Sequence, residues 1–141
     1  MTAITELRAM TLDGDSPLAR EPRWVGWQEK LWQGKPPTKV PQAPRGGAAK
    51  TNDPGTWSTR AAAEECAARL QTAAPGRKSG IGIIIGARSP AVAIPIQGID
   101  LDSCFTEDGE LTPWAADIVR AFPTYWETSV SGSGLHALFR A

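Results

Sequence analysis

The chain has 141 residues, a length that suits one domain and is short for two. Hydrophobic residues make up 41% of it and charged residues 21%, as in globular proteins, and no apolar run approaches the ~20 residues that span a bilayer. We therefore expect a cytoplasmic protein without a membrane partner. The formal net charge of zero lacks the basic excess that nucleic-acid-binding proteins usually carry.

The charges are nevertheless segregated along the chain. Residues 20–50 contain seven basic side chains and two acidic ones, whereas residues 97–128 contain seven acids and one arginine. A positive arm beside a negative pocket suits an enzyme that holds metal ions with one part and a polyanion with the other. Chance segregation on a solvated surface explains the charges equally well.

The first part of the chain is expected to contain a leader and a hairpin. Residues 1–20 are predicted to be irregular, and residues 21–141 to form a single domain. Alternating large apolar and small or polar residues over 23–28 predict a strand. After a turn at 33–35, residues 38–41 are expected to form a short edge strand, because proline cannot donate to a ladder.

A helix and a buried strand are expected next, with a soft subdivision of the domain near residue 78. Asp53 or Ser58 is predicted to cap a helix that continues to about residue 70. Its inner face is expected to carry Ala62, Cys66 and Leu70. The β-branched run at 80–86 predicts a strand that is buried on both faces.

The last third of the chain is predicted to alternate strands and a helix. The expected elements are a loop or hairpin at 88–96, a strand at 97–103, a turn at 107–110, a helix from Thr112 to the residue before Pro123, and strands at 125–129 and 135–139. Residues 114, 118 and 122 repeat at four-residue spacing and are expected to face the core. Trp24, Trp57 and Trp114 are predicted to be core residues, and Cys66 and Cys104 to be buried free thiols.

Asp100 and Asp102 are candidate metal ligands. Side chains two residues apart on a strand point to the same face and lie ~6 to 7 Å apart, so both carboxylates can bind one or two divalent cations. Mg²⁺ or Mn²⁺ held there could activate a hydroxyl and stabilise a leaving pyrophosphate. An exposed acidic strand and a transferase that uses nucleotide sugars remain open alternatives for Asp-x-Asp.

The turn Ser131-Gly132-Ser133-Gly134 is a candidate anion site. Glycine allows successive backbone N–H groups to converge, and the two serines add hydroxyls. His136, the single histidine of the sequence, follows two residues later and could donate to a phosphate oxygen. A plain hairpin turn followed by a half-buried histidine is the alternative.

Together these segments resemble the N-terminal primase-polymerase domain of phage and plasmid replication proteins, in the archaeo-eukaryotic primase superfamily. Its hydrophobic-Asp-hydrophobic-Asp motif resembles residues 99–102, and its second motif, which ends in a histidine, resembles residues 125–136. Upstream segments also fit, so the resemblance covers nearly all of residues 21–141. These segments are 23–27, 35–41, 51–57 and 80–82.

The resemblance implies an α/β (α+β) fold, with a mixed sheet in an RRM-like core packed by helices. It implies template-directed nucleotidyl transfer in DNA replication of a phage, plasmid or related mobile element, with Mg²⁺ or Mn²⁺. The implied partners are nucleoside triphosphates, a single-stranded DNA template and a helicase domain or protein.

The resemblance also implies roles for individual residues. Asp100 and Asp102 would hold the metal, and His136, Ser131 and Ser133 would bind the triphosphate, with Lys39 as a further phosphate contact. Template phosphates would contact Lys35, Arg45 and Lys50, and a base could stack on Trp27 or Trp32. Lys39 could instead serve only to keep an edge strand soluble.

The sequence departs from the family pattern in one important respect. The third motif of the family, another acidic metal ligand, should follow His136, yet no residue up to Ala141 takes that role. We therefore expect the first part of a catalytic domain, or a natural truncation of one, which is incomplete at its C-terminus and inactive by itself. A non-catalytic nucleic-acid or nucleotide-binding remnant that assists a replication partner is the alternative.

Overall fold

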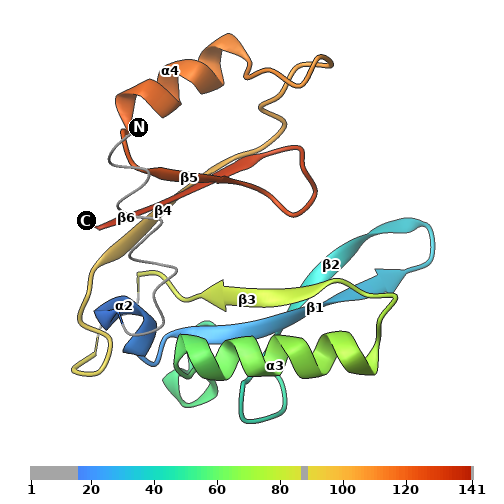
Figure 1. The fold of residues 1–141 in the computed structure, drawn as a ribbon, viewed down its shortest axis with the longest axis vertical. Helices are drawn as coiled ribbons and strands as arrows, with labels where there is room; N and C mark the ends of the chain where they lie inside the picture. The colour runs from blue at the N-terminus through green and yellow to red at the C-terminus, as the bar shows by residue number, and fades with distance from the viewer. Residues whose placement is uncertain (1–15, 87–88, 141) are drawn as a thin grey trace. The chain divides into compact units, whose positions relative to one another are not determined.

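The computed structural model describes residues 16–86 and 89–140, which form helices and two three-stranded antiparallel sheets (Figure 1). The expected α+β class is confirmed. Where a mixed sheet was expected, every strand pair of these residues is antiparallel. Two compact units divide the described chain after Ile94. We call residues 16–94 the N-terminal unit and residues 95–140 the C-terminal unit.

The sheet of the N-terminal unit has the order β2-β1-β3, with β1 at Trp24–Trp32, β2 at Lys35–Gln42 and β3 at Ser79–Ile83. The predicted turn joins β1 to β2, and its Gly34 has a φ of 72°, which favours glycine. The expectation that β2 lies at an edge is confirmed. The prediction that residues 80–86 are buried on both faces is wrong, because β3 pairs only with β1 and is half-buried.

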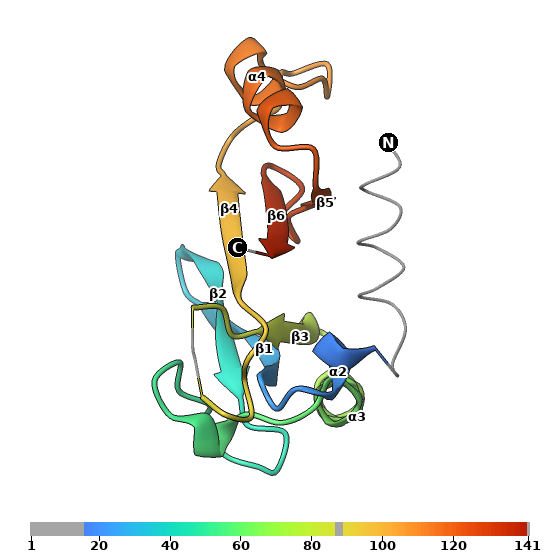
Figure 2. The ribbon, with the colours of Figure 1, turned by 90° about the vertical axis from the view of Figure 1, so that its left-hand side faces the viewer.

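Helix α3 (Arg60–Ala73) packs against this sheet, and Figure 2 views it almost along its axis. Gly26 of β1 permits the close approach, because a Cβ there would lie 2.7 Å from the sulfur of Cys66. Cys66 is buried as predicted. Ala63 is the second buried residue of the helix, whereas the predicted Ala62 and Leu70 are half-buried.

The predicted cap of α3 is wrong. The Thr59 hydroxyl accepts the N–H of Ala62, while Asp53 caps only the short 3-10 helix η1 (Pro54–Thr56). Ser58 is unavailable as a cap because its backbone exchanges two hydrogen bonds of 2.8 Å with Trp24. This pairing extends the sheet next to β1.

The leader predicted at residues 1–20 overlaps the described part of the chain only from residue 16 onward. Residues 1–15 lie outside the described part of the chain. Residues that follow are helical rather than irregular, since Pro17–Arg20 form α2, whose first turn is capped by the Ser16 hydroxyl. Proline suits a first helical turn because it has no N–H to satisfy there.

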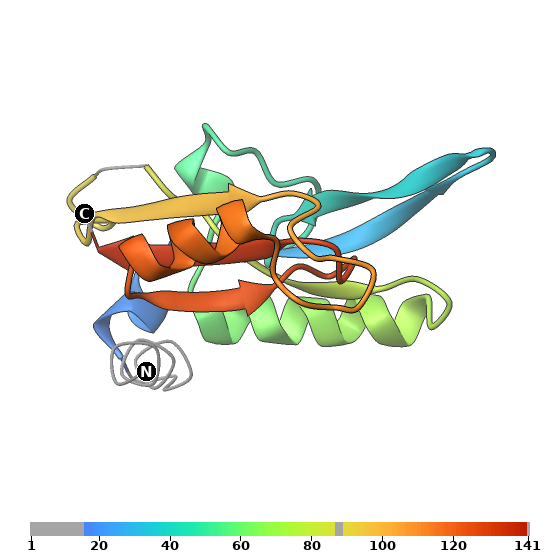
Figure 3. The same cartoon turned by 90° about the horizontal axis from the view of Figure 1, so that it is seen from above.

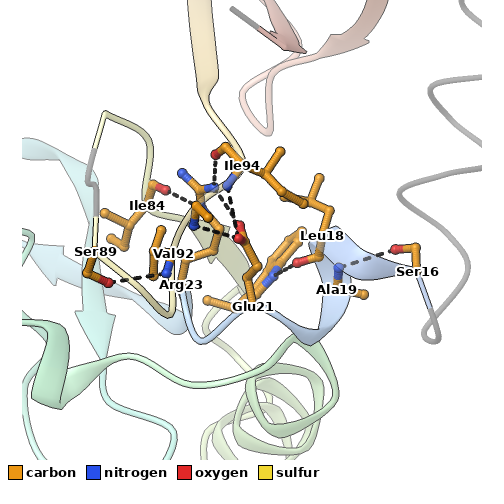
Figure 4. A network of polar contacts seen from close by, with 11 residues as sticks. Ser16, Leu18, Ala19, Glu21, Arg23, Ile84, Ser89, Val92 and Ile94 are labelled. Carbon is orange, nitrogen blue, oxygen red and sulfur yellow. Dashed lines mark hydrogen bonds and ion pairs between the residues drawn. The ribbon is translucent and has the colours of Figure 1, made fainter.

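Arg23, which directly precedes β1, binds the backbone of Ile84 and Ile94 through hydrogen bonds, as Figure 4 shows. Its buried guanidinium donates from Nε to the Ile84 carbonyl (2.9 Å) and from Nη1 to the Ile94 carbonyl (2.6 Å). Nη1 also pairs with a carboxylate oxygen of Glu21 at 2.9 Å. The other oxygen of Glu21 accepts the N–H groups of Ala93 (2.7 Å) and Ile94 (3.0 Å).

The sheet of the C-terminal unit has the order β4-β6-β5, with β4 at Ile96–Leu101, β5 at Tyr125–Thr128 and β6 at Leu135–Arg140. Figure 3 looks through α4 (Pro113–Ala121) onto this sheet. The buried residues of its core are Leu101, Cys104, Ala115 and Leu135. Each unit has such a core, and that of the N-terminal unit contains Val25, Trp57, Ile84 and Val92.

Several predictions about single core residues can be compared with the structure. Trp24 and Trp57 are buried and both cysteines are buried and free, as expected. Trp114 is 47% exposed, so its placement in the core was wrong. Residues at strict four-residue spacing rotate by about 40° per step around a helix of 3.6 residues per turn, and Ala115 faces the core instead.

Among the residues described, no helix is long and apolar enough to cross a membrane.

Candidate functional site

Asp100 and His136 face each other across β4 and β6. They are direct partners in the antiparallel register, and Nε2 of His136 lies 3.2 Å from Oδ1 of Asp100. On the other side of β6, Glu127 of β5 is the direct partner of His136. Directly paired residues project to the same face of a sheet. The three side chains therefore form one row across the sheet, which we call the acid-histidine row.

The acid-histidine row is exposed because the core of the C-terminal unit lies on the opposite face of the sheet. Ile99 and Trp126 alternate with the row residues and pack in the core on the side of α4. The side chain of Asp100 is 64% exposed and that of His136 is 35% exposed. The Tyr125 hydroxyl donates to Glu127 at 2.8 Å. Sequence reasoning did not single out Glu127, because its pairing with His136 depends on strand register.

Asp102 is placed differently from the prediction. Strand β4 ends at Leu101 and not at residue 103, so Asp102 lies in an exposed turn. Ser103 has a φ of 50°, and the Cys104 N–H then donates to the Ser133 carbonyl at 3.2 Å. This turn breaks the extended geometry that would have aligned the two carboxylates on one strand face. It also places residues 102–104 beside the serine-glycine turn.

Three serines line up in the turn between β5 and β6. The hydroxyl oxygens of Ser129 and Ser131 lie 3.0 Å apart, and those of Ser131 and Ser133 lie 2.9 Å apart. The N–H of Gly134 donates to the Ser129 hydroxyl at 3.0 Å. Ser129 was not among the predicted site residues, although the two-residue spacing of Ser129, Ser131 and Ser133 was a usable signal. Ser131 and Ser133 are exposed, as a phosphate contact requires.

Gly134 joins this turn to the end of β4. A Cβ at this position would lie 2.6 Å from the carbonyl oxygen of Leu101, closer than real contacts allow. Glycine therefore lets the turn rest against the residue that precedes Asp102. The serine hydroxyls and the Asp-x-Asp motif meet at the same end of the sheet for this reason.

The oxygen ligands present suit Mg²⁺ or Mn²⁺ in part. Among residues 16–86 and 89–140, no group of three His, Cys, Asp or Glu side chains is arranged to hold a metal ion. Mg²⁺ is commonly bound by one or two carboxylates together with substrate phosphates and water, without a complete protein cage. Carboxylates such as those of Asp100 and Asp102 are the type of ligand that such a partial set contains, and the oxygen of Asp100 that contacts His136 is Oδ1.

The predicted phosphate-binding cations belong to the N-terminal unit, whereas Asp100, Asp102, Ser131, Ser133 and His136 belong to the C-terminal unit. Lys39 of β2 places Nζ 4.7 Å from the centre of the Trp27 ring. The other three predicted cations, Lys35, Arg45 and Lys50, are exposed. The backbone of Lys50 is hydrogen-bonded, since its carbonyl accepts the Trp57 indole N–H at 2.7 Å.

Opposite net charges distinguish the two units. Residues 16–94 carry twelve Lys or Arg and five Asp or Glu, a formal net charge of +7. Residues 95–141 carry two basic and seven acidic residues, a formal net charge of −5. The formal net charge of zero for the whole chain is therefore the sum of unlike parts, among them a basic unit and an acidic unit. A basic surface suits a polyanion, and an acidic surface suits cations.

Comparison with known proteins gives one informative similarity. No protein-family model matches the chain. The chain is 28% identical over 123 residues to the DNA primase-polymerase of Nitratiruptor phage NrS-1. The match covers 86% of this chain, which spans 15% of the length of that curated relative. The similarity supports a replication-related primase or polymerase interpretation, in agreement with the motifs in the sequence.

Proposed function

We propose that this chain supplies the nucleotide- and metal-binding part of a primase-polymerase-type nucleotidyltransferase. The observation that carries the proposal is the 3.2 Å contact between His136 and Asp100, at the sheet end where the serine-glycine turn meets β4. Carboxylates for a cation and donors for a phosphate thereby share one region. The similarity to a phage DNA primase-polymerase adds support from outside the structure.

In the proposed function, side chains of the C-terminal unit would bind the metal ion and the triphosphate. Asp100 and Asp102 would hold Mg²⁺ or Mn²⁺, whose charge, when bound, stabilises the phosphates and the leaving pyrophosphate. The contact with Asp100 orients the imidazole of His136, so that it can donate to the triphosphate of the bound nucleotide. Ser131 and Ser133 would add hydroxyl donors. A 3′ hydroxyl, or an initiating nucleotide, then attacks the α-phosphate and pyrophosphate leaves.

The N-terminal unit would contribute cations. Lys39 would contact a further phosphate of the nucleotide, and the exposed Lys35, Arg45 and Lys50 would contact phosphates of a single-stranded DNA template. A helicase domain or protein is a further partner that the family resemblance implies. These roles match the net charge of +7 of residues 16–94.

Metal-dependent nucleotide binding tests this proposal without requiring turnover. The chain should bind a fluorescent deoxynucleoside triphosphate in Mg²⁺ or Mn²⁺ and lose most of that affinity in EDTA. The double variant Asp100→Asn with Asp102→Asn should weaken binding by at least about tenfold, because the cation loses both carboxylates. Titration followed by fluorescence anisotropy measures both effects.

Two exposed acids of the turn at 107–110 provide a matched control. Glu107→Gln with Asp108→Asn removes the same charge from the same unit and should leave nucleotide binding unchanged. The Asp100/Asp102 double variant should also abolish nucleotide incorporation by the complete gene product. Wild-type incorporation by that variant would refute the proposal.

A second candidate function is supported by the charge of the N-terminal unit. A net charge of +7 over residues 16–94 suffices for nucleic-acid binding without catalysis. A non-catalytic binding module that assists a replication partner would bind single-stranded DNA in a salt-sensitive way that EDTA does not change. Absence of any metal-dependent nucleotide binding, combined with such DNA binding, would favour this second function.

A further inference from the structure

The hairpin of β1 and β2 continues beyond the rest of its sheet. Strand β3 pairs only with residues 24–28 of β1, so residues 29–39 form a two-stranded projection, which we call the ribbon. Figure 3 shows it extending away from β3 and α3 of the same unit. Burial falls along β1, from buried at Trp24 to exposed at Trp32. The ribbon therefore adds no side chains to a core.

Trp32 is held in position while much of its surface remains exposed. Its indole N–H donates to the Thr38 hydroxyl at 2.9 Å, and Nζ of Lys30 lies 4.2 Å from the ring centre. The residue is nevertheless 45% exposed. The neighbouring Leu31 is 52% exposed. An ordered aromatic ring next to a cation, outside any core, is a surface that suits a stacked base.

Trp27, the other candidate for base stacking, is held against the sheet by contacts with β3. Its indole N–H donates to the Ile81 carbonyl at 3.0 Å. Its ring lies against Gly80, where a Cβ would come within 2.8 Å of a ring carbon. A base would have to compete with these contacts. The structure therefore separates two tryptophans that the sequence could not distinguish.

The charges of the ribbon select a polyanion. Three lysines project from it, Lys30, Lys35 and Lys39, and all are exposed. Its one acid, Glu29, accepts the backbone N–H of Lys78 at 3.0 Å. Lysine is depleted in protein–protein interfaces, whereas exposed lysines interleaved with an aromatic ring are typical of grooves that bind single-stranded nucleic acid.

We propose that the ribbon binds single-stranded nucleic acid, with a base stacked on Trp32 and phosphates at Lys30 and Lys35. This inference rests on the proposed function only for the identity of the strand as a template. The binding itself requires neither a nucleotide nor a metal. It should be sequence-tolerant, because every base has a face that can stack.

Removal of the ring tests the stacking contact. Trp32→Ala should weaken binding of a fluorescein-labelled oligothymidylate of about 16 nucleotides by roughly tenfold, measured by fluorescence anisotropy. Trp32→Phe keeps an aromatic face and should retain most of the affinity. Trp114→Ala, which removes an indole of similar exposure from α4, should leave binding unchanged. Circular dichroism should show that each variant folds.

Removal of the lysines tests the phosphate contacts independently. Lys30→Ala with Lys35→Ala should lower the slope of log K against log salt by about 1.4, since each phosphate contact to a single strand contributes about 0.7. Arg120→Gln removes an exposed cation of the C-terminal unit and should leave the slope unchanged. Oligouridylate and a DNA duplex serve as comparison ligands, and the duplex should bind more weakly.

Each outcome decides between distinct conclusions. Unchanged affinity in Trp32→Ala, an unchanged salt slope in the lysine variant, or preference for the duplex would overturn the ribbon proposal. Loss of strand binding in the ribbon variants, with intact metal-dependent nucleotide binding, would support it together with the proposed function. If Asp100→Asn with Asp102→Asn retained nucleotide binding while the ribbon variants lost strand binding, only the proposed function would fail.

Discussion

Arg23 shows how one buried side chain can organise the residues just before β4. The guanidinium is completely buried and pairs with Glu21, whose side chain is 11% exposed. Together the two residues bind the backbone at Ile84, Ala93 and Ile94. The segment just before β4 is thereby tied to the start of β1. Nε and Nη1 of Arg23 are paired or hydrogen-bonded, which offsets part of the cost of burying the charge.

Arg23→Ala should lower the free energy of unfolding by about 3 to 5 kcal/mol, because it leaves the carboxylate of Glu21 buried without its partner. Urea denaturation monitored by tryptophan fluorescence measures this loss. Arg120→Ala is the control, since the Arg120–Asp117 pair is more than 70% exposed on both sides and should contribute less than about 1 kcal/mol. A loss in Arg23→Ala as small as the loss in Arg120→Ala would contradict a structural role of the Arg23 network.

The hairpin of β5 and β6 positions the candidate site at the scale of an element. Its turn carries the three aligned serines, and its second strand carries His136 opposite Asp100. Gly134 is the point where the turn of the hairpin meets the end of β4, because no room exists for a side chain next to the Leu101 carbonyl. The requirement comes from close backbone approach, since Gly134 is not among the glycines with positive φ.

Gly134→Ala should destabilise the C-terminal unit by about 1 to 3 kcal/mol, because a Cβ 2.6 Å from the Leu101 carbonyl forces the backbone to shift. It should also weaken metal-dependent nucleotide binding, since the turn would move relative to Asp100 and Asp102. Thermal denaturation and nucleotide titration give the two readouts. Gly76→Ala, where a Cβ meets nothing within 4 Å, should leave both nearly unchanged. A stable, fully binding Gly134→Ala would contradict this explanation.

At the scale of the whole molecule, the chain combines two units that each have a sheet, a helix and a core. One core contains Val25, Trp57, Ile84 and Val92, and the other contains Leu101, Cys104, Ala115 and Leu135. Their formal charges are opposite. The proposed function uses this division, with the basic unit as the part proposed to contact a polyanion and the acidic unit as the part proposed to hold a cation.

Leu135→Ala should destabilise the C-terminal unit by about 2 to 5 kcal/mol, because it leaves a cavity beside Leu101 and Ala115. Native-state hydrogen exchange should show a larger loss of protection at amides of β4–β6 than at amides of β1–β3. Val92→Ala should give the opposite pattern, since Val92 is in the core of the N-terminal unit. Equal losses in both units for both variants would mean that they unfold as one.

Local sequence patterns were sufficient for much of the fold. The alternation at 23–28 identified β1, Thr112-Pro113 identified the start of α4, and the two strands around the serine-glycine turn were predicted close to their observed bounds. These features depend on the periods of helix and strand and on residues that favour caps and turns. The sequence therefore determined the order of elements and the residue types of the candidate site.

Only the tertiary structure decided which residues meet. The strand register makes His136 the direct partner of both Asp100 and Glu127. The close contact of Gly134 with the Leu101 carbonyl places the serine-glycine turn next to the turn that contains Asp102. Long-range packing also left Trp32 exposed on a ribbon and committed Trp27 to the sheet. Such pairings join residues far apart in sequence, so no local periodicity encodes them. The sequence by itself supplied the chemistry of the site, and tertiary contacts decided its geometry.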